Sequence, residues 1–215
     1  MVTGLIVQSK IKHKPVKRLF DICFSFLVLS VGLPFYILIS LIIFASSPGP
    51  IFYVQPRVGR KGKIIKCFKF RTMCINAEEK LKKILESDAA LKEEYNKFRK
   101  LKNDPRVFSF GKFLRKTSLD ELPQFFNVLL GDLSVVGPRP AMPSEVEKFF
   151  KNRAEKILSI RPGITGIWQT SGRNNLSFED RVKLDEIYVD SQSFKKDMEL
   201  IIKTIPMLFF SKGAY

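Results

Sequence analysis

The chain has 215 residues, with 37 Lys and Arg against 21 Asp and Glu, a formal net charge of +16 and 45% hydrophobic residues. This apolar content can bury a core, which excludes disorder throughout. Three cysteines and a single histidine exclude a disulfide scaffold and a His-rich metal site. The basic excess indicates an anionic partner: nucleic acid, anionic lipid or a phosphorylated substrate.

The most informative stretch is an uncharged segment near the start of the chain. No charged residue occurs between Asp21 and Arg57, and residues 23–45 are almost entirely apolar. As a helix rising ~1.5 Å per residue, this segment could cover the ~30 Å hydrocarbon core of a membrane. A buried helix of a soluble protein and a cleaved signal peptide are the alternatives. The segment is longer than the ~7–15 apolar residues typical of a signal peptide.

Basic residues flank this segment on both sides, and Gly32 and Pro34 lie in its middle. Because positive charge stays on the cytoplasmic side, both flanks favour that side. A helix that breaks and returns to the same face satisfies both, whereas a kinked spanning helix remains the alternative. We therefore predict a basic tail at 1–16, a re-entrant membrane helix at 17–46 with a break near Pro34, and a compact cytoplasmic domain at 47–215.

The rest of the chain predicts an α+β domain that is mostly helical, with a small β element. Residues 51–73 are typical of two strands around a turn that contains Gly59 and Gly62. Residues 76–101 are rich in Lys and Glu and predict an exposed helix or helical hairpin.

Capping signals and turn residues divide the remainder into further helices and one loop. The expected elements are a helix at 118–130 closed by Gly131, a helix from a Ser144 to Glu147 capping box through Ile157, a loop at 161–166, a helix at 177–189, and an amphipathic helix at 194–210, bent or broken near Pro206.

Two adjacent carboxylates, Asp120 and Glu121, are the first candidates for chemistry. One could attack phosphorus as a nucleophile, and the other could bind Mg²⁺, which prefers oxygen ligands. The alternative is structural, because Ser118 and Glu121 have the spacing of a capping box. Pro123 indicates instead that the helix begins nearer Asp120, since proline is tolerated in a first turn.

Arg139 lies between two prolines, Pro138 and Pro140. The fixed φ angles stiffen the backbone, so the guanidinium is presented with little entropy to lose and could bind phosphate through two hydrogen bonds. The alternative is a rigid turn with a solvated arginine.

Other polar residues have weaker signals. Lys69 and Arg71 alternate on a probable strand and would share one face. Trp168 and Gln169 follow the 161–166 loop; the ring could stack on a base or sugar or lie in the core. Asp185 has Arg181 four residues before it, the spacing of a surface ion pair.

Together, and in this order, these stretches resemble the bacterial sugar transferase family, the monotopic polyprenyl-phosphate phosphoglycosyltransferases. The matching pieces are KRLFDICFS at 17–25, the apolar segment with Pro34, SPGPIFYVQPRVGRKGK at 47–63, KFRTM at 69–73, LDELPQFFNVLLGDLSVVGPRP at 119–140, RPGITGIWQTSGRN at 161–174, RVKLDEIYV at 181–189 and the terminal GAY.

The resemblance implies a reaction at the cytoplasmic face of the bacterial inner membrane. Family members transfer a sugar 1-phosphate from a nucleotide diphosphosugar to a polyprenyl phosphate, through an aspartyl phosphosugar intermediate. Carried over, Asp120 is the nucleophile, Glu121 is the Mg²⁺ ligand and Arg139 binds phosphate. Further polar positions that match the family's site are Lys69, Arg71, Arg115, Gln169 and Asp185.

The resemblance further implies a UDP-sugar donor, undecaprenyl phosphate as acceptor, and contact with membrane lipid. The ITGIWQTSGRN stretch and the GAY ending favour galactose or glucose. Leu33 occupies the position where some small members carry a serine, so a helix break must rest on Pro34. The oligomeric state stays open, with a homodimer as one arrangement.

Two other classes of function compete with this one. A non-catalytic membrane-surface scaffold would keep the basic faces and the anchor, but would not need Asp120, Glu121 and Arg139 together. A nucleic-acid-binding protein would explain the charge, yet the chain has no recognised binding motif and such a protein has no use for a lipid-like segment.

Overall fold

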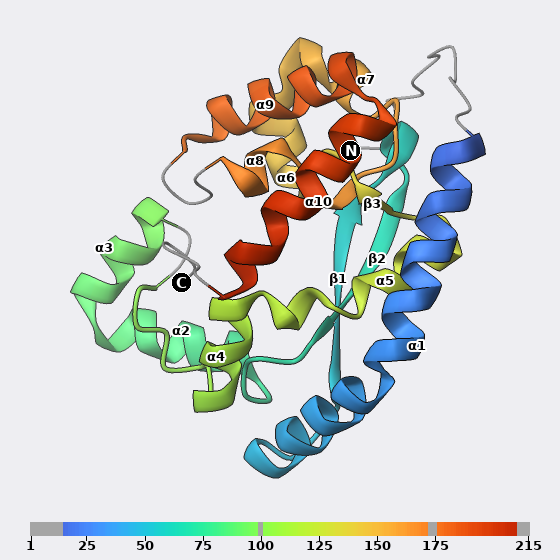
Figure 1. Cartoon of the computed structure of the whole chain (residues 1–215). Helices are drawn as coiled ribbons and strands as arrows, with labels where there is room; N and C mark the ends of the chain where they lie inside the picture. Colours follow the sequence, from blue (N-terminus) through green and yellow to red (C-terminus); the bar gives the residue numbers. More distant parts are fainter. Residues whose placement is uncertain (1–14, 99–100, 172–175, 210–215) are drawn as a thin grey trace.

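The computed structural model of the chain describes residues 15–98, 101–171 and 176–209 (Figure 1). Most of the predicted basic tail, the end of the last predicted helix and the GAY ending lie outside these residues. In this part the chain is mostly helical and has two small two-stranded sheets, which confirms the predicted α+β class with a small β element.

The longest element is α1 (Pro15–Ser46), a helix that continues through Pro34. A proline inside a helix lacks the N–H donor, and its ring clashes with the carbonyl four residues earlier, here that of Ser30, so the axis bends. Figure 1 shows α1 changing direction a little past its middle. The predicted break therefore corresponds to a bend in a continuous helix, and its course in a membrane stays a prediction.

The apolar surface of α1 is largely exposed. By length and composition α1 could cross a membrane, and only 17% of its most apolar stretch is buried. The core helix of a soluble protein would instead be mostly covered, and a contiguous apolar surface of this extent marks contact with lipid or a partner. More than half exposed are the side chains of Val16, Leu19, Phe26, Leu27, Val31, Leu33, Phe35, Ile37, Leu38, Leu41 and Phe44.

The predicted strand pair is confirmed as β1 (Phe52–Val58) and β2 (Ile64–Phe70), which form an antiparallel hairpin. Lys61 and Gly62 have positive φ angles in the intervening turn. Glycine adopts such angles without the clash of a Cβ, which explains the choice of glycine at Gly62.

The Lys- and Glu-rich region forms the predicted helical hairpin, α2 (Ala77–Ser87) and α3 (Ala89–Phe98). Asp88 separates the two helices, and its Oδ1 accepts hydrogen bonds from the backbone N–H groups of Ala90 and Leu91. Figure 1 shows this hairpin standing out from the rest of the molecule.

The predicted helix at 118–130 is wrong in its first half. α4 (Ser109–Thr117) ends at Ser118, which adopts a left-handed conformation with φ of 58°. A short 3-10 turn, Leu119–Glu121, follows, and α5 (Gln124–Leu130) is closed by Gly131 as predicted. An N-cap residue typically has extended φ and ψ angles, so Ser118 is the C-cap of α4 and not an N-cap, and the capping-box alternative is excluded.

Two short strands, β3 (Ser134–Val136) and β4 (Gly163–Thr165), pair in parallel. β4 lies in the stretch predicted as a loop. A Cβ on Gly163 would come within 2.0 Å of the backbone nitrogen of Gly137. The glycines here therefore allow the two backbone segments to approach closely. This requirement comes from the tertiary structure and cannot be read from a glycine-rich sequence that is typical of a loop.

The predicted helix from Ser144 to Ile157 is present but irregular. It begins one residue earlier as α6 (Pro143–Glu145), passes through a π segment and a 3-10 turn, and ends as α7 (Ala154–Ile157). Glu145, not Glu147, reaches back to the start, where its Oε2 accepts a hydrogen bond of 2.7 Å from the Met142 N–H. The Ser144 to Glu147 capping box is therefore wrong.

Three helices complete the described chain: α8 (Ile167–Thr170), α9 (Phe178–Ser191) and α10 (Phe194–Phe209). Ser177 caps α9 by accepting a hydrogen bond from the Asp180 N–H, which confirms the predicted start. α10 continues through Pro206, so its described part is not broken there, and the alternative of a bend stays a prediction.

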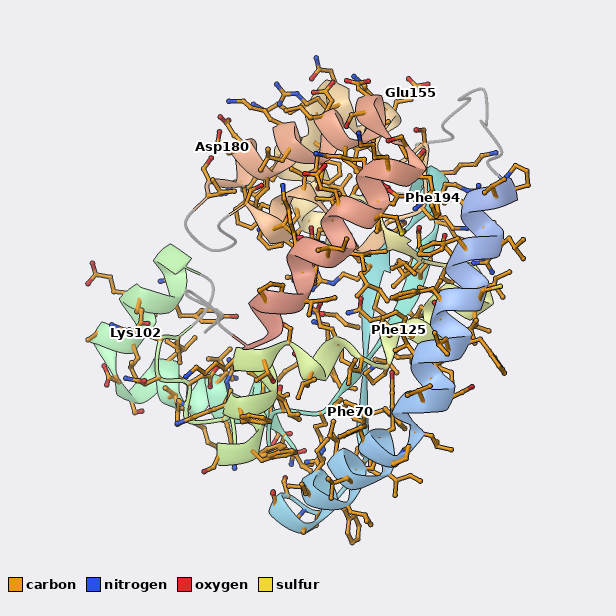
Figure 2. The ribbon with its side chains drawn as sticks, viewed as in Figure 1. Phe70, Lys102, Phe125, Glu155, Asp180 and Phe194 are labelled. Atoms are coloured by element: carbon orange, nitrogen blue, oxygen red, sulfur yellow. The ribbon has the colours of Figure 1, made fainter. Side chains whose placement is uncertain are left out.

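The interior is built mainly around α5 and the β hairpin. Phe125 packs toward Phe24 of α1, and Phe70 packs beside Tyr36 of the same helix. Figure 2 shows Phe70 and Phe125 turned into the molecule, while the labelled charged side chains of Lys102, Glu155 and Asp180 point outward. Each fully buried apolar side chain stabilises the fold by about 1.5–3 kcal/mol.

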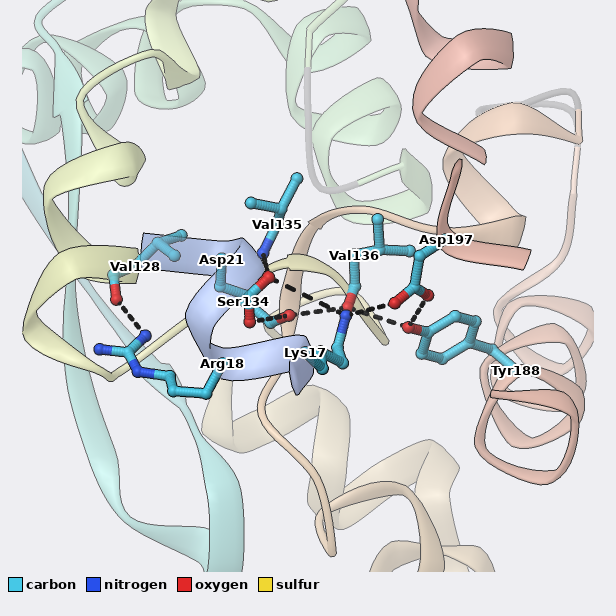
Figure 3. A network of polar contacts seen from close by, with 9 residues as sticks. All are labelled: Lys17, Arg18, Asp21, Val128, Ser134, Val135, Val136, Tyr188 and Asp197. Atoms are coloured by element: carbon cyan, nitrogen blue, oxygen red, sulfur yellow. Dashed lines mark hydrogen bonds and ion pairs between the residues drawn. The ribbon is translucent and has the colours of Figure 1, made fainter. Parts of the chain in front are cut away.

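A buried polar network fastens the start of α1 to the domain (Figure 3). The Nζ of Lys17 lies 2.7 Å from Oδ2 of Asp197, a residue of α10. The Tyr188 hydroxyl of α9 donates to Oδ1 of the same carboxylate at 2.6 Å. This network joins α1 to two helices from the other end of the described chain, α9 and α10.

A second set of contacts extends the attachment to β3 and α5. Asp21 accepts hydrogen bonds from the Ser134 hydroxyl at 2.8 Å and the Val135 N–H at 3.1 Å. Arg18 donates to the Val128 and Leu129 carbonyls in the last turn of α5. The Val128 carbonyl also accepts a hydrogen bond from the Gly131 N–H, which closes this helix. The first two turns of α1 are thus part of the domain's own structure.

We predict that Lys17→Met lowers the free energy of unfolding by about 3 kcal/mol, because it leaves buried carboxylates without their ammonium partner. Thermal unfolding in detergent measures this. The matched control is Lys66→Met, an exposed lysine on β2. Equal unfolding temperatures for the two variants would contradict the prediction.

Candidate active site

A cleft of about 1210 Å³ opens beside the 3-10 turn. Its volume exceeds the ~300–1,000 Å³ typical of sites for one small ligand, so two substrates have room. Its lining combines charged, neutral polar and apolar side chains. The charged ones are Lys69, Arg71, Glu78, Glu79, Arg106, Arg115, Asp120, Glu121 and Arg139, and the apolar part includes Phe24 and Val28 of α1, Phe125 of α5, and Ile201 and Ile205 of α10.

The 3-10 turn brings Asp120 and Glu121 to the end of β2. The ammonium of Lys69 lies 2.7 Å from Oε1 of Glu121 and 3.8 Å from Oδ2 of Asp120. Ser118 in its left-handed conformation and Pro123 at the start of α5 hold the turn between them. The structure therefore brings Asp120, Glu121 and Lys69 together at the end of β2.

The two carboxyl groups have opposite pKa shifts. Burial raises the pKa of Asp120 and outweighs the attraction of Lys69. Burial also opposes ionisation of Glu121, but Lys69 and Arg139 outweigh it and lower the pKa of that group. Glu121 is thus the permanently charged member, and Asp120 is the more basic one.

Arg139 reaches the same turn from the Pro-Arg-Pro segment. Its Nη1 lies 3.9 Å from Oε1 of Glu121, and its guanidinium carbon lies 4.9 Å from the centre of the Trp168 ring. The alternative of a merely solvated arginine is wrong, since the side chain is held between a carboxylate and an aromatic face.

Arg115 approaches from the last turn of α4. Its Nε donates a hydrogen bond of 2.9 Å to the hydroxyl of Thr72. Burial lowers the pKa of this guanidinium, and Asp120 is the largest influence opposing that shift. Arg115 therefore adds positive charge at the edge of the cleft.

Arg71 borders the cleft but is engaged elsewhere. It donates to the Pro50 carbonyl and to the hydroxyl and carbonyl of Ser47. These contacts hold the segment that leaves α1 against the end of β2. Lys69 thus pairs with the carboxylates of the dyad, whereas Arg71 holds the segment after α1.

Gln169 lines the cleft, and its Nε2 donates to the Ile164 carbonyl at 3.4 Å. Asp185 does not line it, because the side chain is buried behind Arg139. Burial raises the pKa of Asp185 to about 7. The surface ion pair suggested for Asp185 and Arg181 is wrong, since Asp185 is 5% exposed and Arg181 stacks on Trp168 and Phe178.

Arg57 is a site residue that the sequence analysis missed. It is 7% exposed, its Nη2 donates to Oε1 of Gln55 at 2.8 Å, and its Nη1 lies 3.6 Å from Oε2 of Glu145. Arg57 also helps to lower the pKa of Glu121. The available signal was the position of Arg57 on the inward-facing side of a strand. In the sequence, however, Arg57 could not be told apart from the exposed basic residues around it.

The residues present fit a Mg²⁺ ion at the dyad. No group of three or more His, Cys, Asp or Glu side chains suited to a metal occurs among residues 15–98, 101–171 and 176–209. Two adjacent carboxylates in an open cleft still match this ion, which proteins commonly hold with one or two carboxylates plus substrate phosphates and water. If the ion binds there, the ammonium of Lys69 would have to give up part of its contact with Glu121.

The sequence profile of the bacterial sugar transferases matches residues 12–211, so the chain belongs to this family. It is 43% identical to the undecaprenyl-phosphate galactose phosphotransferase of Salmonella typhimurium, over 96% of this chain and 43% of that protein. It is also 43% identical to the exopolysaccharide production protein ExoY of Sinorhizobium fredii, over 93% of this chain and 88% of that protein.

Glucose-specific names occur among the relatives as well. The UDP-glucose:undecaprenyl-phosphate glucose-1-phosphate transferase of Escherichia coli is 37% identical over 94% of this chain. The chain spans less than half the length of the galactose and glucose phosphotransferases, and most of the length of ExoY.

The contacts of Arg71 give a testable contrast with an exposed basic residue. We predict that Arg71→Ala lowers the free energy of unfolding by about 2–4 kcal/mol, because several charged hydrogen bonds to the segment after α1 are lost. Lys66→Ala, at an exposed position on β2, serves as the control and changes stability by less than about 1 kcal/mol. Thermal unfolding of both variants measures this, and a stable Arg71→Ala protein would speak against the structural role.

Proposed function

We propose that the protein transfers a sugar 1-phosphate from a UDP-sugar to undecaprenyl phosphate, at the cytoplasmic face of the bacterial inner membrane. One observation carries this proposal: Asp120 and Glu121 lie beside Lys69 and Arg139 in a cleft whose apolar part includes side chains of α1. The names of the relatives, which include a UDP-galactose-lipid carrier transferase, agree with this substrate pair.

In the first step, a carboxylate oxygen of Asp120 attacks the phosphorus that carries the sugar. A bond forms between this oxygen and phosphorus, and the bond to the bridging oxygen of the diphosphate breaks. UMP leaves with that oxygen and its electron pair, and the sugar 1-phosphate remains on Asp120 as an acyl phosphate.

In the second step, a phosphate oxygen of undecaprenyl phosphate attacks the same phosphorus. The new bond joins the lipid phosphate to the sugar phosphate, and the carboxylate of Asp120 leaves with its electron pair. The enzyme is restored and the product is a lipid diphosphosugar. The transfer is thereby divided into two substitutions at the same phosphorus. Asp120 is the nucleophile in the first and the leaving group in the second.

The surrounding cations make attack by an anion on a diphosphate feasible. Arg139 is placed to bind the phosphate oxygens, and Lys69 balances the negative charge of the dyad. Arg115 adds a further positive charge on the α4 side. We assign Glu121 as the main Mg²⁺ ligand, and the ion, when bound, would neutralise charge on the diphosphate.

The apolar part of the cleft suits the acceptor. α1 supplies apolar side chains both to this lining and to its exposed surface, so a lipid chain could pass from the bilayer to the site. A re-entrant course of α1, with the bend at Pro34 inside the cytoplasmic leaflet, would leave both of its ends beside the domain, and we propose that topology.

UMP release by the purified protein in nanodiscs tests the function. Mg²⁺, undecaprenyl phosphate and a panel of UDP-sugars are supplied, and each is omitted in turn. Release that requires lipid and metal supports the proposal, and the panel identifies the sugar, for which we expect galactose or glucose. No release with any donor would favour a non-catalytic scaffold.

We predict that Asp120→Asn abolishes UMP release while folding and membrane association persist, because a neutral amide cannot form the acyl phosphate. Asp190→Asn, an exposed change of the same chemistry on α9, is the control and keeps wild-type activity. Substantial turnover by Asp120→Asn would remove Asp120 as the nucleophile.

We predict that Arg139→Ala lowers kcat/KM for the UDP-sugar by about 100-fold, since a preorganised charge beside the transferred phosphate is lost. Initial rates at varied UDP-sugar concentration measure this. Unchanged kinetics would mean that Arg139 belongs only to the turn.

A further inference from the structure

Trp168 lines the cleft beside the arginine that we assign to phosphate binding. The guanidinium carbon of Arg139 lies 4.9 Å from the centre of its ring, inside the ~6 Å limit of a cation–π contact. The Nη1 of Arg139 lies 3.9 Å from Oε1 of Glu121, which is too long for a hydrogen bond. That carboxylate has a closer partner in Lys69, at 2.7 Å. Glu121 alone therefore leaves the direction of the Arg139 guanidinium loosely fixed.

Two parallel strands bring the ring and the guanidinium to the same edge. Val136 of β3 pairs with Thr165 of β4. Arg139 follows the first of these residues by three positions, and Trp168 follows the second by three. The pairing continues past β3, because the Gly137 N–H donates to the Thr165 carbonyl at 2.9 Å. Since parallel strands run in the same direction, the two segments leave the sheet side by side.

The ring of Trp168 is held in turn by α9. The guanidinium carbon of Arg181 lies 4.1 Å from the centre of this ring and 4.4 Å from the centre of the Phe178 ring. Phe178 stacks on Phe149, with ring centres 4.5 Å apart and 9° between the planes. Trp168 is 6% exposed, so the contacts on its ring are largely shielded from water, which strengthens them. The ring is thus anchored to a second cation that packs against other aromatic side chains.

Arg181 can influence the reaction only through its neighbours, because it is not part of the described lining of the cleft. Burial and repulsion by Arg139 lower the pKa of Arg181 to about 10, so this side chain still carries its charge at neutral pH. The electron-rich face of Trp168 offsets part of the repulsion between the two guanidinium groups.

We propose that Trp168 is a positioning residue: its ring, held by Arg181, keeps the guanidinium of Arg139 beside Glu121 before a substrate binds. The effect on turnover rests on the proposed function. The contact between ring and guanidinium can be measured in the protein without substrate.

A double-mutant cycle tests the effect on turnover. Trp168→Leu is expected to lower kcat/KM for the UDP-sugar by about 3- to 30-fold, the range that corresponds to a cation–π contact. In an Arg139→Ala background the same change is expected to have almost no further effect, because the group that the ring positions is gone. Trp168→Phe keeps an aromatic face and is expected to recover most of the loss.

A second variant leaves the ring in place. Arg181→Met removes the cation but keeps an apolar side chain beside both rings, and it is expected to lower kcat/KM only when Arg139 is present. The matched control is Lys183→Met, which removes an exposed cation from the same helix and keeps wild-type turnover.

Fluorescence tests the contact without any activity, because Trp168 is the single tryptophan of the chain. In folded protein without substrate, Arg139→Ala and Arg181→Met are each expected to change its emission, since each removes a cation from the ring. Lys183→Met is expected to leave the spectrum unchanged. Circular dichroism checks that each variant is folded.

The outcomes separate the two proposals. Additive losses in the cycle would overturn the positioning role and would mean that Trp168 contacts the donor itself. A loss in Trp168→Phe equal to that in Trp168→Leu, or a wild-type emission spectrum in Arg139→Ala, would also overturn it. Normal turnover in Arg139→Ala would instead overturn the site assignment, and the emission spectra would still decide whether the ring holds Arg139.

Discussion

Two adjacent buried carboxylates repel each other and lose hydration, so they persist only where cations converge on them. Lys69, Arg139 and Arg57 meet this need at Asp120 and Glu121. The β hairpin supplies two of the cations and the Pro-Arg-Pro segment supplies the third. The fold around the cleft can therefore be understood as the frame that brings these charges together.

The same logic of buried charge fastens α1 to the domain. Lys17 and Asp197 form a close pair, and Asp21 is satisfied by β3. Farther along α1, the Tyr36 hydroxyl donates to the Leu122 carbonyl, just after the dyad. A helix whose apolar surface is largely exposed on one side is thus tied to the domain by polar contacts on the other. This attachment fixes the position of the apolar wall of the cleft relative to the reacting groups.

Elements governed by local rules were predictable. The β hairpin, the charged helical pair, the Gly131 helix end and the Ser177 cap each follow from turn and capping chemistry within a few residues. The failures share a cause. Serine is a residue type that favours helix N-caps, but Ser118 lies in a left-handed turn. Residues 161–166 have the composition of a loop but contain a strand. Neighbours distant in the sequence decided both.

The sequence by itself determined the chemical types at the site: a pair of carboxylates, an arginine between two prolines and a basic residue ending a strand. Ordered motifs carry this information because each needs particular side chains at fixed spacing. Only the tertiary structure decided their roles. It engaged Arg71 with the segment after α1, brought Arg57 to the dyad and placed Asp185 behind Arg139. Burial and pairing of a charge depend on what packs against it, and local spacing does not contain that information.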